Sequence, residues 1–185
     1  MSRTAVRALP LAALLLAAAL APPAAAEPLF AAPFLSFGTA PNPVAVAVAD
    51  LDGDGQLDVL TMGGYLDGVL SFLPGHGDGT FGAATDRSIG FDIHTTGRAM
   101  VLADLDGDGS LVLVAADPDT AVVSVLPGNG DGTFGARSVF AVAGYPSALA
   151  VGDLNADGHP DLVVCIGRAD MVSVRLGNGD GTFAP

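Results

Sequence analysis

The amino-acid sequence predicts an all-β fold of about three repeated units, each with four short antiparallel strands. The first observation is a Gly-Asp-Gly-Thr-Phe segment that occurs three times in the 185 residues, at 77–81, 130–134 and 179–183. The second is an Asp-rich segment that keeps the same period, because its copies begin at residues 50, 104 and 153. Two independent motifs that share one period indicate a structural repeat.

Each period contains short apolar segments of strand length, separated by Gly, Asp and Pro, and no amphipathic run of helical length. The third repeat shows the plan most clearly, with predicted strands at residues 138–142, 148–152, 162–167 and 172–176. Residues 44–49 alternate Val with Ala, which is typical of a strand that buries one of its faces. Four-stranded units of about 50 residues fit the blades of a β-propeller.

The repeat region is expected to cover residues 27–185, with repeats at about 30–81, 82–134 and 135–183. The third repeat lacks its last strand, and residues 30–38 align with the strand that follows each Gly-Asp-Gly-Thr-Phe turn. About three blades make a partial propeller. Three arrangements follow: a fragment of a longer propeller, several chains that assemble into one ring, or a sheet that closes through the N-terminal strand.

Residues 1–26 have the layout of a secretory signal peptide. Arg3 and Arg7 precede an apolar stretch of Ala and Leu, and small residues then lead to an expected mature start at Glu27. The alternative is an uncleaved anchor helix, because the apolar stretch is nearly long enough to span a bilayer. Cleavage predicts a secreted or cell-surface protein without stable membrane insertion, or a periplasmic one if the source is bacterial. The single cysteine, Cys165, is expected to be a buried small hydrophobe.

The charge balance is strongly acidic. Twenty acidic residues stand against seven arginines and no lysine, which gives a formal net charge of −13. Nucleic acid and anionic lipid would be repelled at long range, so neither is an expected partner. The acidic residues must therefore have another role.

Half of the acidic residues lie in the three Asp-rich segments, where they alternate with other residues, mostly glycines. Alternating carboxylates let a tight loop turn its oxygens toward one hard cation, and Ca²⁺ is the ion that best suits such ligands. The seventh position would contribute a backbone carbonyl. The candidate ligands are Asp50, Asp52, Asp54, Gln56 and Asp58 in the first loop, Asp104, Asp106, Asp108 and Ser110 in the second, and Asp153, Asn155, Asp157, His159 and Asp161 in the third.

The loops are not EF-hands, because position 12 is Thr61, Ala115 or Val164 where a bidentate Glu would be needed. The second loop has Val112 in place of the ninth-position acid, so the predicted order of occupancy is the first loop, then the third, then the second. The alternative is that Asp-Gly pairs only form hairpin turns. We prefer that alternative for the Gly-Asp-Gly-Thr-Phe segments but not for the Asp-rich loops.

These residues resemble the FG-GAP or VCBS-type repeats, which are similar to the N-terminal propeller of integrin α subunits. The matching features are the Phe-Gly pairs at residues 81–82 and 134–135, the Gly-Tyr-Pro segment at 144–146, and the hairpin at 50–58. The resemblance implies a β-propeller with Ca²⁺ in the hairpin between the first two strands of a blade. Propellers of this family usually have about seven blades.

The sequence favours a secreted calcium-binding module, with structural Ca²⁺, that binds an unknown protein or glycan and has a role in adhesion. The alternatives are a non-catalytic part of a larger repeat protein, or an extracellular hydrolase or lyase that uses the propeller channel. No nucleophile elbow or zinc-protease motif is present in the sequence, so no catalytic residue is predicted. Variable loops opposite the Asp-rich edge are expected to carry binding, and they contain Tyr65, Asp67, Asp119, Arg168 and Asp170.

Overall fold

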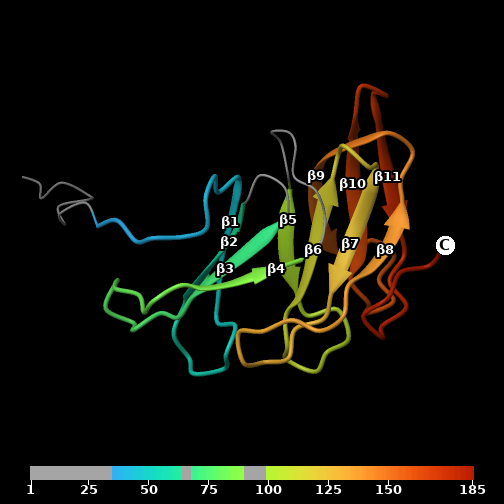
Figure 1. Cartoon of the computed structure of the whole chain (residues 1–185). Coiled ribbons are helices and arrows are strands. Elements are labelled where there is room, and N and C mark those ends of the chain that lie inside the picture. Colours follow the sequence, from blue (N-terminus) through green and yellow to red (C-terminus); the bar gives the residue numbers. More distant parts are fainter. Residues whose placement is uncertain (1–34, 64–67, 90–98) are drawn as a thin grey trace, which may run out of the picture. The chain divides into compact units, whose positions relative to one another are not determined.

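The computed structural model describes residues 35–63, 68–89 and 99–185, of which Ser36–Pro185 belong to one compact unit. This described part is all-β and contains no helix, so none of it could cross a membrane as a helix. Its strands form three antiparallel sheets (Figure 1). The first sheet is β1 (Ala45–Ala49), β2 (Asp58–Gly63), β3 (Val69–Leu73) and β4 (Thr85–Ser88). The second is β5 (Met100–Ala103), β6 (Val112–Asp117), β7 (Val122–Leu126) and β8 (Ser138–Ala141). The third is β9 (Tyr145–Gly152), β10 (Asp161–Gly167) and β11 (Met171–Arg175).

The all-β prediction and the four-stranded plan are confirmed, and the sheets do not close into a ring. The predicted strand at residues 138–142 is β8, and it pairs with β7 in the second sheet. The third sheet therefore has three strands. β9 begins earlier than predicted, at Tyr145, because its pairing with β10 continues past an irregularity at Cys165 and Ile166.

Neighbouring sheets pack face to face. Alternate side chains of each strand point to opposite faces of its sheet, so one sheet can contribute to a core on either side. The first strands contact one another in order, β1 with β5 and β5 with β9. One core lies between the first two sheets and includes Leu60, Leu113 and Phe134. A second core lies between the second and third sheets and includes Val114 and Leu162. The middle sheet is thus apolar on both faces, and β6 is buried along its whole length.

The prediction that residues 30–38 supply a strand is wrong for the described part of that segment, because residues 35–38 form none. Phe37 instead packs edge-on against Phe81, with ring centroids 5.1 Å apart. Ala40 N donates a hydrogen bond of 2.9 Å to Ser71 Oγ, which ties the segment to the first sheet. Three predicted features lie outside the described residues. They are the signal peptide at residues 1–26, the part of the expected N-terminal strand at residues 30–34, and the loop residues Tyr65 and Asp67.

The prediction of a buried Cys165 is also wrong, since this thiol is free and exposed. Leu162, Val164 and Ile166 of β10 face the second sheet and are buried there. Cys165 points to the opposite face of the third sheet, which no further described sheet covers. The apolar run around Cys165 could not show which of its two faces would be covered.

Candidate metal sites

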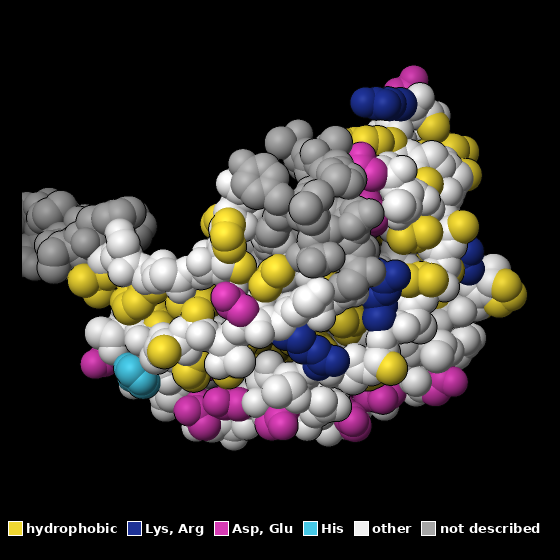
Figure 2. All heavy atoms as spheres, in the orientation of Figure 1, with side chains coloured by type: hydrophobic (Ala, Val, Ile, Leu, Met, Phe, Trp, Pro, Cys, Tyr) yellow, Lys and Arg dark blue, Asp and Glu magenta, His cyan; other side chains and the backbone are white. Residues whose placement is uncertain are grey.

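The three Asp-rich loops occupy equivalent places, since each connects the first strand of a sheet to the second. Acidic side chains gather along the lower edge in Figure 2, where the hairpin loops of Figure 1 lie. An antiparallel meander brings alternate turns to the same edge of a sheet, so the Gly-Asp-Gly-Thr turns that follow the third strands share that edge with the loops.

The first loop is held by hydrogen bonds from its backbone to its own carboxylates. Asp50 Oδ1 accepts from Gly53 N at 2.8 Å, and Asp50 Oδ2 accepts from Gly55 N at 3.0 Å. Asp54 Oδ1 accepts from Gln56 N at 2.7 Å. Gly53 and Gly55 have φ of 76° and 84°, a left-handed conformation that costs glycine little. These hydrogen bonds of the Asp-x-Asp-Gly-Asp-Gly pattern all join residues within five positions of one another.

The second and third loops repeat this arrangement with two changes. Asp104 accepts from Gly107 N at 2.7 Å and from Gly109 N at 3.1 Å, as Asp50 does in the first loop. In the third loop Ala156 takes the place of the first glycine, with φ of 61°. Asn155 there replaces an aspartate, and its Nδ2 donates to Asp157 Oδ2 at 2.8 Å. An amide therefore takes the place of one carboxylate charge in this loop.

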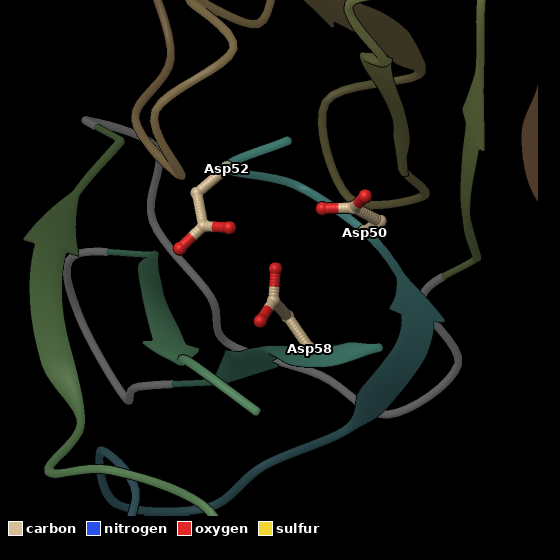
Figure 3. A group of neighbouring side chains, drawn as sticks. All are labelled: Asp50, Asp52 and Asp58. Carbon is tan, nitrogen blue, oxygen red and sulfur yellow. The ribbon is translucent and has the colours of Figure 1, made fainter. Parts of the chain in front are cut away.

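Carboxylates converge in the first two loops. Figure 3 shows the side chains of Asp50, Asp52 and Asp58 turned toward one another. Each of these residues offers an oxygen within 4.8 Å of the others, and Asp104, Asp106 and Asp108 do the same in the second loop. In the part of the chain that the structure describes, no third group of this kind occurs, and neither group includes Asp54.

The electrostatics of the first group fit a hard cation. Loss of solvent around Asp52, together with repulsion from Asp58, Asp54 and Asp50, raises the pKa of the Asp52 carboxyl above its ordinary value. Oxygen ligands crowded in this way are the donors that Ca²⁺ prefers, and the ion removes the repulsion between them. The donor chemistry of this loop therefore suits Ca²⁺.

The ninth-position acids make a second kind of contact that the spacing did not reveal. Asp58 is 0% exposed, and its two oxygens accept from Leu51 N at 2.8 Å and from Gly75 N at 2.7 Å. Asp161 is buried in the same way and accepts from Leu154 N and Gly177 N. Each carboxylate joins its loop to the end of the third strand. A carboxylate oxygen has two lone pairs, so this role is compatible with metal binding.

The seventh-position residues Gln56, Ser110 and His159 each donate a backbone N–H to the acid two residues earlier, at 2.7 to 2.8 Å. The hydrogen bond from His159 N, followed by that from Asn155, lowers the pKa of Asp157. These contacts hold the loops in shape. They do not involve the backbone carbonyl of the seventh position, so its binding of metal stays a prediction.

The Gly-Asp-Gly-Thr-Phe segments form closed turns. In the first, Asp78 Oδ1 accepts from Thr80 Oγ1 at 2.6 Å and from Thr80 N at 2.9 Å, and both bonds lower the pKa of Asp78. Asp131 and Asp180 accept the equivalent hydrogen bonds from Thr133 and Thr182, which lower their pKa values in the same way. A bridge between Gly75 and Phe81 closes this turn, and equivalent bridges close the other two. Each aspartate is used by its own turn.

A cavity of about 210 Å³ lies between the first and second sheets. Its polar lining comes from Thr85, Arg87, Asp131 and Thr133, and Phe72 and Phe134 contribute aromatic walls. Arg87 also donates to Phe134 O. Sequence reasoning missed this combination, because β4 and the second turn are more than 40 residues apart in the chain.

The variable loops at the opposite edge are partly described. Arg168 lies over the Tyr145 ring, with its Cζ 4.7 Å from the ring centroid. Arg168 and Asp170 both have positive φ, 68° and 51°. This contact joins one predicted binding loop to the start of β9.

The repeated blades and their acidic hairpins define an all-β protein of the partial-propeller class. Residues 111–164 match the FG-GAP-like repeat, so the chain contains a repeat of that family. The matched segment runs from the end of the second Asp-rich loop through the third. No curated protein sequence matches the chain.

A lectin from Agrocybe aegerita, solved to explain its specific recognition of non-reducing terminal N-acetylglucosamine, has a similar structure. The TM-score is 0.53 and the sequence identity is 32%. The similar region covers 74% of this chain and 36% of the lectin, so this chain spans about a third of the lectin's length.

Proposed function

We propose that this protein is a secreted β-propeller-type binding module that is stabilised by Ca²⁺. The observation that carries the calcium proposal is the convergence of three carboxylates in each of the first two loops. Asp50, Asp52 and Asp58 would hold one ion, and Asp104, Asp106 and Asp108 another. The ion neutralises the loop and thereby stabilises the hairpin between the first two strands, which makes its role structural.

Thermal unfolding of the full chain in Ca²⁺ and in a chelator tests this proposal. At free Ca²⁺ of about a hundred times the dissociation constant, each site adds roughly 2.7 kcal/mol. This corresponds to a rise of about 5 to 10 °C in Tm for a chain of this size. Equal melting with and without the chelator would contradict the proposal.

Asp52→Asn and Asp106→Asn locate the effect. Asn155 occupies the equivalent position in the third loop and accepts from Asp157 N at 3.0 Å, so an amide fits this backbone. Each variant should lose part of the Ca²⁺-dependent rise in Tm, and Asp52→Asn should melt higher than the wild type in the chelator because it relieves repulsion. Asp170→Asn removes the same charge at the opposite edge and serves as the control.

We propose a terminal sugar of a glycan as the ligand class. The cavity between the first two sheets combines aromatic walls with the hydroxyls of Thr85 and Thr133 and the charges of Arg87 and Asp131. Sugars present apolar C–H faces and hydroxyls, and such a lining suits both. The similar lectin supports this class of ligand. A protein ligand of an adhesive module is the alternative.

Calorimetric titration with N-acetylglucosamine and a panel of other monosaccharides tests the glycan proposal. Thr133→Val removes a hydroxyl from the cavity and should weaken binding by about tenfold, since one lost hydrogen bond in a desolvated site costs on the order of 1.4 kcal/mol. Thr182→Val breaks the same intra-turn hydrogen bond in the third repeat, away from this cavity, and should bind normally. Binding that is equally weak in both variants would argue against the cavity.

We also propose that the protein is not an enzyme. Its described histidines, His76 and His159, are exposed in separate loops, and His76 Nδ1 is 2.9 Å from Thr80 Oγ1. His94 lies outside the described residues. The absence of hydrolysis of the bound glycan over prolonged incubation would be consistent with this proposal.

A further inference from the structure

Neighbouring sheets pack through one arrangement that occurs twice. Leu51 lies in the loop after β1 and is 6% exposed, next to the second Gly-Asp-Gly-Thr-Phe turn. Gly132 N in that turn donates to Leu51 O at 2.9 Å, and Phe134 joins the same core. Leu105 is the equivalent residue of the second loop, and it is 3% exposed in a core that Phe183 of the third turn packs against. The leucine of one sheet thus meets the turn of the next.

The outer face of the third sheet has the leucine of this arrangement, but no turn of a following sheet lies against it in the described chain. Leu154 is equivalent to Leu51 and Leu105, yet it is 57% exposed. Val172 and Val174 of β11 are also exposed, and Cys165 pairs with Val172 across the sheet. We call Leu154, Cys165, Val172 and Val174 the trailing face.

The outer face of the first sheet has the turn of this arrangement, but no leucine of a preceding sheet lies against it in the described chain. Val46 and Val48 precede Asp50 by four and two residues, and they are 66% and 58% exposed. Met100 and Leu102 hold these positions in the second sheet, where they pack against the core shared with the first sheet. With Leu57 and Phe81, Val46 and Val48 make up the leading face.

The leading face is hollowed. Val48, Leu57 and Phe81 line a cavity of about 420 Å³, together with Val59 and residues of the first Gly-Asp-Gly-Thr turn. Phe37 contacts the ring of Phe81 on one side but leaves Val46 and Val48 exposed. The turn that would receive a leucine is therefore present and largely uncovered.

We propose that the trailing face of one copy of this chain packs on the leading face of a second copy, with the geometry that already joins the sheets within the chain. Leu154 of one copy would lie against the Phe81 turn of the other, as Leu51 lies against the Phe134 turn. None of the side chains of either face carries a charge, so their burial leaves no unpaired ion. Apolar faces of this kind on a soluble protein indicate an interaction surface.

A second copy is the occupant because the two faces are complementary halves of one interface, and a second copy supplies both. The contact is heterologous, since different surfaces of the two copies meet. Two such contacts between two copies give six sheets, which is within the range of about four to eight blades found in propellers. The expected assembly is a closed dimer.

The test measures the mass of the full chain by sedimentation in Ca²⁺ and a reductant, which prevents crosslinking through Cys165. The wild type should be a dimer. Val48→Glu on the leading face and Val174→Glu on the trailing face should each be monomeric, because every contact in their homodimers contains a buried glutamate. Val139→Glu changes an exposed valine of β8 outside both faces and should remain dimeric.

A mixture of the two monomeric variants separates this interface from any other. Val48→Glu retains an intact trailing face and Val174→Glu an intact leading face, so the mixture should form a one-to-one dimer with a single good contact and a weaker Kd than the wild type. A thiol reagent should label Cys165 several-fold more slowly in the wild type than in Val48→Glu. A monomeric wild type, a dimer insensitive to both substitutions, or a mixture that stays monomeric would overturn the proposal.

Discussion

The first and second Asp-rich loops have the same backbone and differ at one buried position. In both, the first aspartate accepts from the two glycine N–H groups, and three carboxylates converge. The ninth residue is Asp58 in the first loop and Val112 in the second, and both are buried. Asp58 uses both of its oxygens on backbone N–H groups, whereas Val112 packs in the apolar core.

The difference distinguishes two roles within the motif, the formation of the loop and its attachment to the third strand. The spacing of the aspartates alone did not distinguish them. The loop conformation depends on the first residues of the motif, because the second loop adopts it without a ninth-position acid. The third converging carboxylate differs between the loops, since it is Asp58 in the first and Asp108 in the second. The ninth-position acid connects the loop to the end of the third strand. Its presence in the first and third repeats therefore does not by itself determine which loops bind metal.

The largest expected effect comes from removal of the buried acids. Asp58→Ala leaves Leu51 N–H and Gly75 N–H without their partner, and each buried donor left unpaired costs about 1 to 3 kcal/mol. The free energy of unfolding should therefore fall by about 2 to 6 kcal/mol in denaturant titrations. Asp161→Ala should cost less, because the Leu154 and Gly177 hydrogen bonds that it removes are only part-buried. The measurement is made in a chelator so that metal binding does not contribute.

Asp54→Ala is the matched control, since Asp54 is an exposed acid of the same loop that accepts one hydrogen bond. It should cost less than about 1 kcal/mol. Equal losses for Asp54→Ala and Asp58→Ala would show that the buried acid has no special structural role.

A smaller effect is expected where the third loop departs from the other two. Ala156 has φ of 61°, at a position that is glycine in the first and second loops. A left-handed conformation costs a residue with a Cβ about 1 to 2 kcal/mol, so Ala156→Gly should stabilise the protein by about 1 kcal/mol. Gly107→Ala makes the reverse change and should destabilise by a similar amount. Thermal unfolding of both variants checks the pair, and the same sign for both would refute the explanation.

The smallest expected effect is a loss of stability at low pH. Hydrogen bonds from Thr80, Thr133 and Thr182 lower the pKa values of Asp78, Asp131 and Asp180 below the ordinary 3.8. A carboxylate whose folded pKa is lowered stabilises the fold above its unfolded pKa, and this contribution is lost as pH falls through the folded pKa. Stability in a chelator should therefore decline as pH falls below about 4.

Asp52 acts in the opposite direction, because its raised pKa means that protonation relieves repulsion in the first loop. Thr80→Val should raise the pKa of Asp78 toward its ordinary value and reduce the acid sensitivity of the fold. Denaturant titrations of the wild type and this variant between about pH 6 and pH 2 provide the comparison. An unchanged pH profile in Thr80→Val would contradict the assignment.

Much of the fold could be predicted because its signals are local. The alternation of Val and Ala before Asp50 predicted β1, and turn residues at a fixed period predicted the hairpins. The strand that follows Gly135 was also predicted, and the structure pairs it with the preceding sheet. The structural role of Asp58 could not be predicted, because Gly75 reaches it only after β2 and β3 have paired.

The exposure of Cys165 and the cavity beside Arg87 were unpredictable for a related reason. An apolar run shows that a strand has a face to bury, but coverage depends on which sheet lies opposite. Cys165 and Val164 are neighbours in β10, and only Val164 faces another sheet. Thr85 and Thr133 meet at one cavity because the first two sheets pack together.

The sequence by itself determined the repeat period, the all-β class and the conformation of each acidic loop, because these depend on hydrogen bonds and backbone preferences within a few residues. Only the tertiary structure decided which equivalent residues are covered. Leu51, Leu105 and Leu154 occupy the same position in three repeats, and burial separates them since the first two have a following sheet to pack against and the third has none in the described chain. Burial depends on what lies opposite a residue in space, which a local pattern does not encode.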